Sequence, residues 1–316
     1  MSEIDTKGTG RSGSRFHIIA DRELEKILSL PRAFIFLVAA IILPIVSAYA
    51  ADVDSYPLDI QALMLKDILF FTVYFWVGGI VLAFFAAWTV SDFIVGEDSR
   101  GTLLSLITRP IRRWEVILGK FLAYLLFVAV MEIIAIFITI YVLVTISGAH
   151  LSVIWDLFLY IPILLLYSLF VAVVFGTIPL VLSTVSKSRV LVMIISAALV
   201  IVIYLAFYII RSGFSEFYVD NHLYYFDPGY HMGNIFISFT EAAGIDLTPT
   251  FQEQMGLFAG THNLGVSLDE PDQGFQLASI PLTNYYSQAT SWLIWTLIPA
   301  GLTVLSVFRL KKKKIQ

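Results

Sequence analysis

Side chains able to carry out acid–base or metal chemistry are few in this sequence and mostly lie outside its apolar runs. A loose group lies in one acidic region: Asp220, His222, Asp227, His231 and His262. Histidine and aspartate bind zinc or copper, and with serine they form catalytic sets. No tight ligand spacing occurs here, and acidic regions collect such residues by default. We therefore expect neither a metal site nor a catalytic residue.

One ionisable residue, Glu132, lies inside a long apolar segment, residues 121–148. If that segment crosses a membrane, an ionisable group there costs about 2.5–3.5 kcal/mol on insertion scales. In one interpretation, Glu132 faces a substrate path or takes part in a proton-linked step. In the other, it is a protonated or hydrogen-bonded residue packed inside a helix bundle. Packing is the commoner outcome, and both interpretations stay open.

The most informative polar segment is residues 97–120, which lies between two apolar runs and holds five of the twenty Lys and Arg residues. The pattern predicts two short amphipathic helices, residues 99–108 and 112–120. Arg109-Pro110 separates them, because proline ends the first helix and favours a turn. From the residues alone, the segment is either a solvated loop with a basic cluster or a docking surface for a partner.

The composition indicates a membrane protein. The chain has 316 residues, of which 58% are hydrophobic and 14% charged, and its mean hydropathy is +0.84. Soluble domains are about 45–50% apolar and about 25% charged. The absence of cysteine excludes disulfides, thiolate metal sites and cysteine nucleophiles.

Six segments have the roughly 20 apolar residues that a membrane-spanning helix needs. Glu132 is the only charged residue within them. The predicted spans are residues 33–51, 68–90, 121–148, 157–182, 190–210 and 285–308. Because backbone polar groups in lipid must be satisfied within each segment, we expect an all-α fold with six transmembrane helices.

The basic residues predict the orientation of these spans. All of the Lys and Arg except Lys66 and Arg211 lie on one side of the predicted bundle. Under the positive-inside rule, that side and both termini are cytosolic. Ala48-Tyr49-Ala50 resembles a signal-peptide cleavage site, but the polar stretch before the first apolar run is longer than such signals have, so we favour a retained span.

The remaining segments predict a simple domain order. Residues 1–14 are rich in Gly, Ser and Thr and are expected to be disordered. Residues 15–32 predict an amphipathic helix in the cytosolic interface. Residues 33–316 form the transmembrane domain, with a cytosolic loop at 91–120. Residues 212–284, called the cap from here on, are acidic and aromatic and predict short helices and loops on the extracytoplasmic side, between the fifth and sixth spans.

The polar segment resembles the cytosolic loop of type-2 ABC transporter permeases. The matching positions are an acid, a Gly-Thr-Leu triplet and a Thr-Arg-Pro-Ile-x-Arg-x-Glu-x-x-Leu-Gly-Lys string. In this sequence they are Glu97, Gly101-Thr102-Leu103, Thr108-Arg109-Pro110-Ile111, Arg113, Glu115 and Leu118-Gly119-Lys120. Residues 21–32 are similar to that family's amphipathic N-terminal helix, and the order of the six spans matches as well. The cap is longer than the re-entrant helices usual there.

The resemblance implies a half-transporter of the cell membrane whose loop carries a coupling helix that docks on a separate ABC ATPase. Two permease chains, identical or homologous, and two ATPases would form the working unit. The sequence contains no G-x-x-x-x-G-K-[ST] phosphate loop, so ATP and Mg²⁺ are expected on the ATPase and no cofactor on this chain. The residues expected to form the coupling surface are Glu97, Arg100, Gly101, Thr102, Arg109, Pro110, Arg113 and Glu115.

The expected function is export of a hydrophobic or amphipathic cargo, such as a lipid, lipid-linked glycan, drug or peptide, by alternating access. Phe71, Phe75 and Gly78, together with Glu132, are candidates for the path, although packing is the commoner role for such residues. Membrane lipid is an expected partner and nucleic acid is not. Two alternatives stay open: a permease-like subunit whose cap serves an extracytoplasmic assembly partner, and an intramembrane enzyme.

Overall fold

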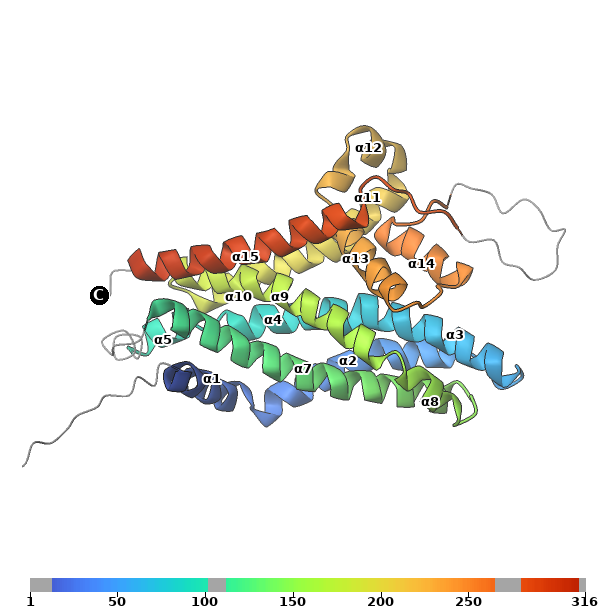
Figure 1. Ribbon diagram of the computed structural model, residues 1–316, viewed down its shortest axis with the longest axis horizontal. Helices are drawn as coiled ribbons and strands as arrows, with labels where there is room; N and C mark the ends of the chain where they lie inside the picture. The colour runs from blue at the N-terminus through green and yellow to red at the C-terminus, as the bar shows by residue number, and fades with distance from the viewer. Residues whose placement is uncertain (1–12, 102–111, 265–279, 313–316) are drawn as a thin grey trace, which may run out of the picture.

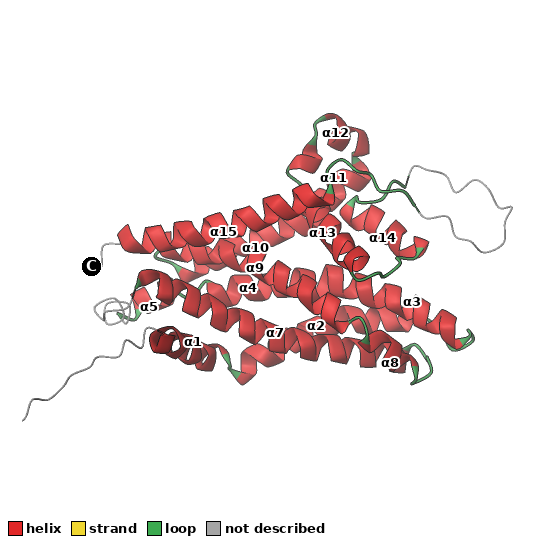
Figure 2. Cartoon of the chain, viewed as in Figure 1, coloured by secondary structure: helices red, strands yellow, loops and turns green. Residues whose placement is uncertain are grey.

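The computed structural model describes residues 13–101, 112–264 and 280–312. These residues are almost entirely helical and contain no strand, only an isolated bridge between His262 and Leu282 (Figure 2). The helices, with π- and 3-10 segments marked η, are α1 (Gly13–Ile27), α2 (Leu30–Ala50), α3 (Leu58–Phe71), η1 (Thr72–Val81), α4 (Leu82–Val90), α5 (Val95–Ser99), α7 (Arg113–Ile146), α8 (Val153–Phe158), α9 (Ile161–Val185), α10 (Arg189–Ile201), η2 (Val202–Ala206), α11 (Phe207–Gly213), α12 (Ser215–Asp220), η3 (Leu223–Tyr225), α13 (Pro228–Ala242), α14 (Pro249–Ala259) and α15 (Gln288–Lys312).

Within the described parts of the chain, six helical stretches are long and apolar enough to cross a membrane, so the predicted all-α fold with six candidate spans is confirmed. Their bounds are Leu30–Ala50, Leu58–Ser99, Arg113–Ile146, Ile161–Val185, Arg189–Gly213 and Gln288–Leu310. Pro44, Pro179 and Pro299 lie inside these helices without ending them. The six stretches form one elongated bundle with roughly parallel axes (Figure 1).

The second span begins earlier than the apolar run that predicts it. The run starts at residue 68, but the helix starts at Leu58 and includes Lys66 and Asp67. Both charged side chains are buried against the cap: the Lys66 ammonium donates to the Asp246 carbonyl at 2.8 Å, and Asp67 accepts a hydrogen bond from the Thr248 hydroxyl. Contacts with a distant segment thus allow charged residues to continue the helix.

Three spans form the centre of the bundle and three lie around it. In the most apolar 18-residue part of each span, the share of residues that are buried is 67%, 50% and 50% for the second, third and fourth spans. The corresponding shares for the first, fifth and sixth spans are 22%, 28% and 17%. The second span has α2 on one side, through rings of Phe36 and Phe85 that lie 5.1 Å apart, and α10 on another. The peripheral spans therefore leave broad apolar faces for lipid or another chain.

Different elements form the two ends of the bundle. At one end lie α1, α5, the start of α7 and the end of α15, which we call the polar end; toward the other end, the helices of the cap lie beside α3 (Figure 1). α1 packs against α7 and buries Ile19, Ala20 and Ile27.

The interfacial helix predicted over residues 15–32 is divided in the structure. α1 ends at Ile27, and α2 begins at Leu30 with a proline in its first turn. Gly13 and Ser14, predicted to be disordered, belong to α1, and the rest of that predicted stretch lies outside the described residues.

Candidate functional site at the polar end

A buried lysine joins three helical segments at the polar end. Lys120 of α7 is 1% exposed, and its ammonium lies 2.7 Å from a Glu23 carboxylate oxygen on α1 and 2.6 Å from one of Glu97 on α5. It also lies 5.7 Å from the centroid of the Phe93 ring. Burial by itself raises the pKa of Glu23, but Lys120 and then Lys26 favour the carboxylate more strongly, and the net pKa lies below the ordinary 4.5.

Two of the predicted coupling residues have structural partners within the chain. Glu97 is turned inward onto Lys120. Glu115 is buried, and its side chain accepts a hydrogen bond from the Arg112 backbone amide at 3.0 Å, which closes a capping box at the start of α7. Both carboxylates therefore organise the polar end and are not presented as a bare acidic surface.

The other described residues of the predicted coupling surface lie nearer to the surface of the protein. The Arg100 side chain is 52% exposed and donates to Asp92 at 3.0 Å. Gly101 has φ +69 and open space around it, which suits a chain reversal by glycine. Arg113 donates to the Leu310 carbonyl and so joins the start of α7 to the end of α15. Thr102, Arg109 and Pro110 lie outside the described residues.

Glu23 and Lys120 are not among the predicted site residues, although their positions in the sequence indicate that both could be buried. Glu23 is four residues from Ile19 and four from Ile27, so it lies on the apolar face of α1. Lys120 directly precedes the third apolar run, residues 121–148. A charge on an apolar face predicts a buried partner, but the sequence does not say which residue that partner is.

The four candidate path residues fall into two groups. Phe71 and Phe75 stack on each other with centroids 5.5 Å apart, and both contact Phe258 of the cap. Gly78 lies against Ser168 of α9, so closely that a Cβ at Gly78 would overlap the Ser168 hydroxyl.

Glu132 belongs to the second of these groups. It is fully buried beside Ser168 without a well-formed hydrogen bond, and among the described residues no ion pair reaches it. A buried carboxyl group without a close polar partner is costly to place inside a helix bundle. Gly78, Ser168 and Glu132 thus form one contact across three spans, at the π-helical segment η1, and such segments frequently mark functional sites.

The described histidines and aspartates of the cap are held in separate structural contacts. Asp227 pairs with Arg211, accepts a hydrogen bond from the Tyr218 hydroxyl at 2.8 Å and caps α13. A ring nitrogen of His231 lies 2.9 Å from the hydroxyl of Ser291, where it joins α13 to α15. Among the described residues, no three His, Cys, Asp or Glu side chains form a group that could hold a metal ion.

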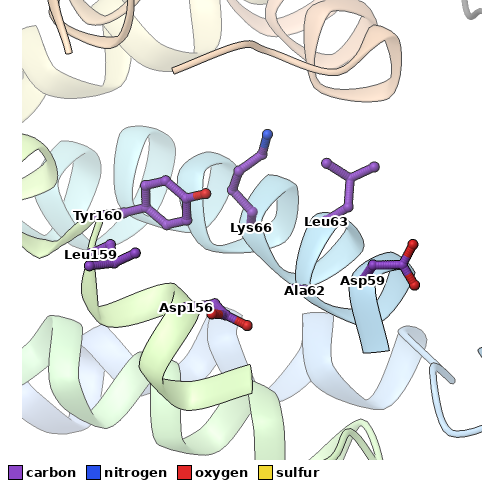
Figure 3. Close-up of a pocket in the computed structure, with 7 residues that line it drawn as sticks. All are labelled: Asp59, Ala62, Leu63, Lys66, Asp156, Leu159 and Tyr160. Carbon is purple, nitrogen blue, oxygen red and sulfur yellow. The ribbon is translucent and has the colours of Figure 1, made fainter. Parts of the chain in front are cut away.

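A cleft of about 290 Å³ lies between α3 and the α8–α9 connection (Figure 3). It is lined by Asp59, Ala62, Leu63, Lys66, Asp156, Leu159 and Tyr160. The Lys66 ammonium points away from both aspartates in this view, toward the cap. The charged groups thus do not converge on a common point, and we assign no ligand to this cleft.

The fold and the charge distribution define a class of protein: a multi-pass membrane protein with a polar, cross-linked end. A comparison of the sequence with known protein families then identifies the family of this chain. The model described as "ABC-2 family transporter protein" matches residues 17–315, nearly the whole chain. The chain therefore belongs to that family, the type-2 ABC transporter permeases, and is a transmembrane permease component that works with an ABC ATPase subunit. A search of curated proteins found no match.

Proposed function

We propose that this chain is the permease subunit of an ATP-driven exporter of the plasma membrane, with the polar end and both termini in the cytosol. Two permease chains, identical or homologous, and two ATPases form the working complex, and ATP and Mg²⁺ are bound by the ATPases. The cargo is hydrophobic or amphipathic: a lipid, lipid-linked glycan, drug or peptide. Family membership and the distribution of basic residues support this proposal.

The main support for a coupling role is a set of contacts that connect the loop between the second and third spans to other helices. Glu97 reaches α1 through Lys120, and Arg113 reaches α15 at Leu310. The Arg112–Glu115 capping box makes the loop's end continuous with α7. An ATPase that moves this loop would therefore displace α1, α7 and α15 together, as alternating access requires.

Arg100, Gly101 and Arg113, with Thr102, Arg109 and Pro110, form the docking surface in this proposal. Glu97 and Glu115 hold that surface in place. The contact of Gly78, Ser168 and Glu132 is the candidate for the cargo path, because it joins three central spans at a π-helical segment. Phe71 and Phe75 form the part of the path next to the cap.

Charge reversal at the exposed coupling residue tests the docking role. We expect Arg100→Glu to abolish co-purification of the ATPase and cargo export, while the variant stays monodisperse. Arg22→Glu is the matched control, because Arg22 lies on the exposed face of α1. Unchanged ATPase binding and export in Arg100→Glu would refute the assignment of the docking surface.

A second candidate function is favoured by the cap. Phe214, Phe217 and Phe226 are exposed on and beside α12, which projects from the bundle (Figure 1). Such an aromatic surface suits an extracytoplasmic assembly partner. Replacing all three with Ser separates the two functions: loss of a co-purifying partner with export retained would favour the assembly role.

A further inference from the structure

Two arginines from separate elements pair with one aspartate at the polar end, and a third arginine, Arg32, lies near them. Arg100, after α5, lies 3.0 Å from one carboxylate oxygen of Asp92, and Arg189, at the start of α10, lies 3.6 Å from the other. Asp92 itself is 4% exposed. Arg32, in the first turn of α2, holds its guanidinium 5.9 Å from the ring centroid of Trp88, four residues before Asp92.

The cluster carries surplus positive charge. Arg32 interacts electrostatically with Asp92, Arg189, Arg100 and also Glu23. Glu23 is already paired with Lys120 and Lys26, so Asp92 is the acid that the three guanidinium groups share. Among the ion pairs and charge interactions given for the described residues of this cluster, three positive charges share one carboxylate, which leaves two in excess. The Arg100 and Arg189 side chains are 52% and 37% exposed, so an anion can reach them.

The surroundings of the cluster indicate where that anion comes from. Leu30 and Phe34 flank Arg32 and are exposed, as are Val190 and Leu191 directly after Arg189. These apolar side chains lie in the first turns of two spans, where hydrocarbon tails begin. The guanidinium groups therefore lie at the height of lipid headgroups, over surfaces suited to acyl chains.

We propose that Arg32 and Arg189 form a binding site for the phosphate of an anionic phospholipid in the leaflet at the polar end, while Arg100, 3.0 Å from Asp92, neutralises that carboxylate and stays part of the docking surface. Guanidinium groups bind phosphate oxygens in a bidentate manner, and the surplus charge selects a lipid with net negative charge over a zwitterionic one. The assignment of this leaflet to the cytosolic side rests on the proposed topology, whereas the site itself is independent of cargo and of transport direction.

Lipid binding to the purified full-length chain tests the site. Native mass spectrometry would compare phosphatidylglycerol with phosphatidylcholine, for the unaltered chain and for the double variant Arg32→Gln/Arg189→Gln. We expect the unaltered chain to prefer phosphatidylglycerol and the double variant to bind it on the order of tenfold more weakly. Arg22→Gln removes a charge from the exposed face of α1 and should change the affinity less than about twofold. Equal losses in both variants would overturn the proposal.

Two further measurements localise the site and identify the source of the phosphate. A photoactivatable phosphatidylglycerol should cross-link the unaltered chain at peptides that contain Arg32 or Arg189; cross-links confined to other regions would contradict the proposal even if the double variant does not fold. Inorganic phosphate at millimolar concentration should leave lipid binding unchanged. Full displacement by phosphate would show a site for a free anion and overturn the lipid assignment.

Discussion

Two buried ionic clusters, one at each end of the bundle, are built from similar residues in different ways. At the polar end, Lys120 pairs with Glu23 and Glu97, which are 97 and 23 residues away in the chain. In the cap, Arg211 pairs with Asp227, only 16 residues away, and also donates to the Phe258 carbonyl.

The difference lies in how much geometry each cluster specifies. The lysine ammonium is a compact charge on a flexible stem and can follow carboxylates that move. The arginine guanidinium is planar, and Asp227 is further held by Tyr218 and by the first turn of α13. The contacts of Lys120 at the polar end can therefore persist while helices move, whereas the bonds of Arg211 and Asp227 hold the cap in a fixed position at the end of the fifth span.

The largest effect is expected when Asp227, the carboxylate of the ionic cluster in the cap, is replaced by alanine. This change leaves Arg211 buried without its carboxylate and removes the Tyr218 bond and the cap of α13, so we expect a loss on the order of 4–6 kcal/mol in the free energy of unfolding. Thermal unfolding in detergent, followed by tryptophan fluorescence, measures it. Asp220→Ala, on the exposed end of α12, should change little. A small loss at Asp227 would remove the distinction between the two clusters.

The corresponding change at the polar end is Lys120→Met. It leaves Glu23 and Glu97 buried without their shared cation, and we expect a cost of about 3–5 kcal/mol. Unlike the cap variant, it should also uncouple ATP hydrolysis from transport in the reconstituted complex. Lys26→Met is the matched control, because its pair with Glu23 is more exposed and worth about 1 kcal/mol or less. Normal coupling in Lys120→Met would argue against the transmission role.

An intermediate effect is expected where the central spans touch. Gly78→Ala places a methyl group against the Ser168 hydroxyl, and overpacking of this kind costs about 1–3 kcal/mol. Ser168→Ala in the same chain should recover part of the loss. Gly301→Ala in α15, where a Cβ meets open space, should be neutral or slightly stabilising. Additive losses in the double variant would show that Gly78 and Ser168 are not in contact.

Acidification should affect the two ends over different ranges of pH. Burial lowers the pKa of His262 in the cap from the ordinary 6.5 to about 4. Because the unfolded chain then binds the proton more readily, this contribution to stability is complete above about pH 6.5 and is lost as the pH falls toward 4. His231 is shifted in the same direction, also by burial. The Glu23 contribution persists above its ordinary pKa of 4.5 and is lost only below it.

Hydrogen exchange between pH 7 and 5 measures this contrast. Amides of α13 and α14 should lose protection before those of α1 do. His262→Gln should reduce the pH dependence of the cap, whereas His150→Gln, at an exposed histidine, should leave it unchanged. Earlier loss of protection in α1 would reverse the expected order of the two ends.

The smallest effect on stability is expected for Glu132→Gln. If the buried side chain is the neutral acid, the amide replaces it almost isosterically, and the change in unfolding free energy should stay below about 1 kcal/mol. Export by the reconstituted complex then separates the two interpretations that the sequence leaves open. Retained export supports packing, and lost export at retained stability supports a role in the path.

The sequence by itself determines the fold class and the family of this protein. Six apolar runs must become helices, since lipid offers no partner for an exposed backbone amide or carbonyl. The string from Gly101 to Lys120 indicates a type-2 permease, in agreement with the family match. These signals are local: each can be read from a window of consecutive residues without knowing what lies beside it.

Which polar residues meet depends on how the helices pack. The packing starts the second span ahead of Lys66 and Asp67, turns Glu97 toward Lys120, and packs Phe71 against Phe258 of the cap. Each of these outcomes depends on how helices far apart in the chain cross, because a buried charge is stable only where another element supplies its partner. The identity of that partner is a property of the packed bundle and not of any single segment.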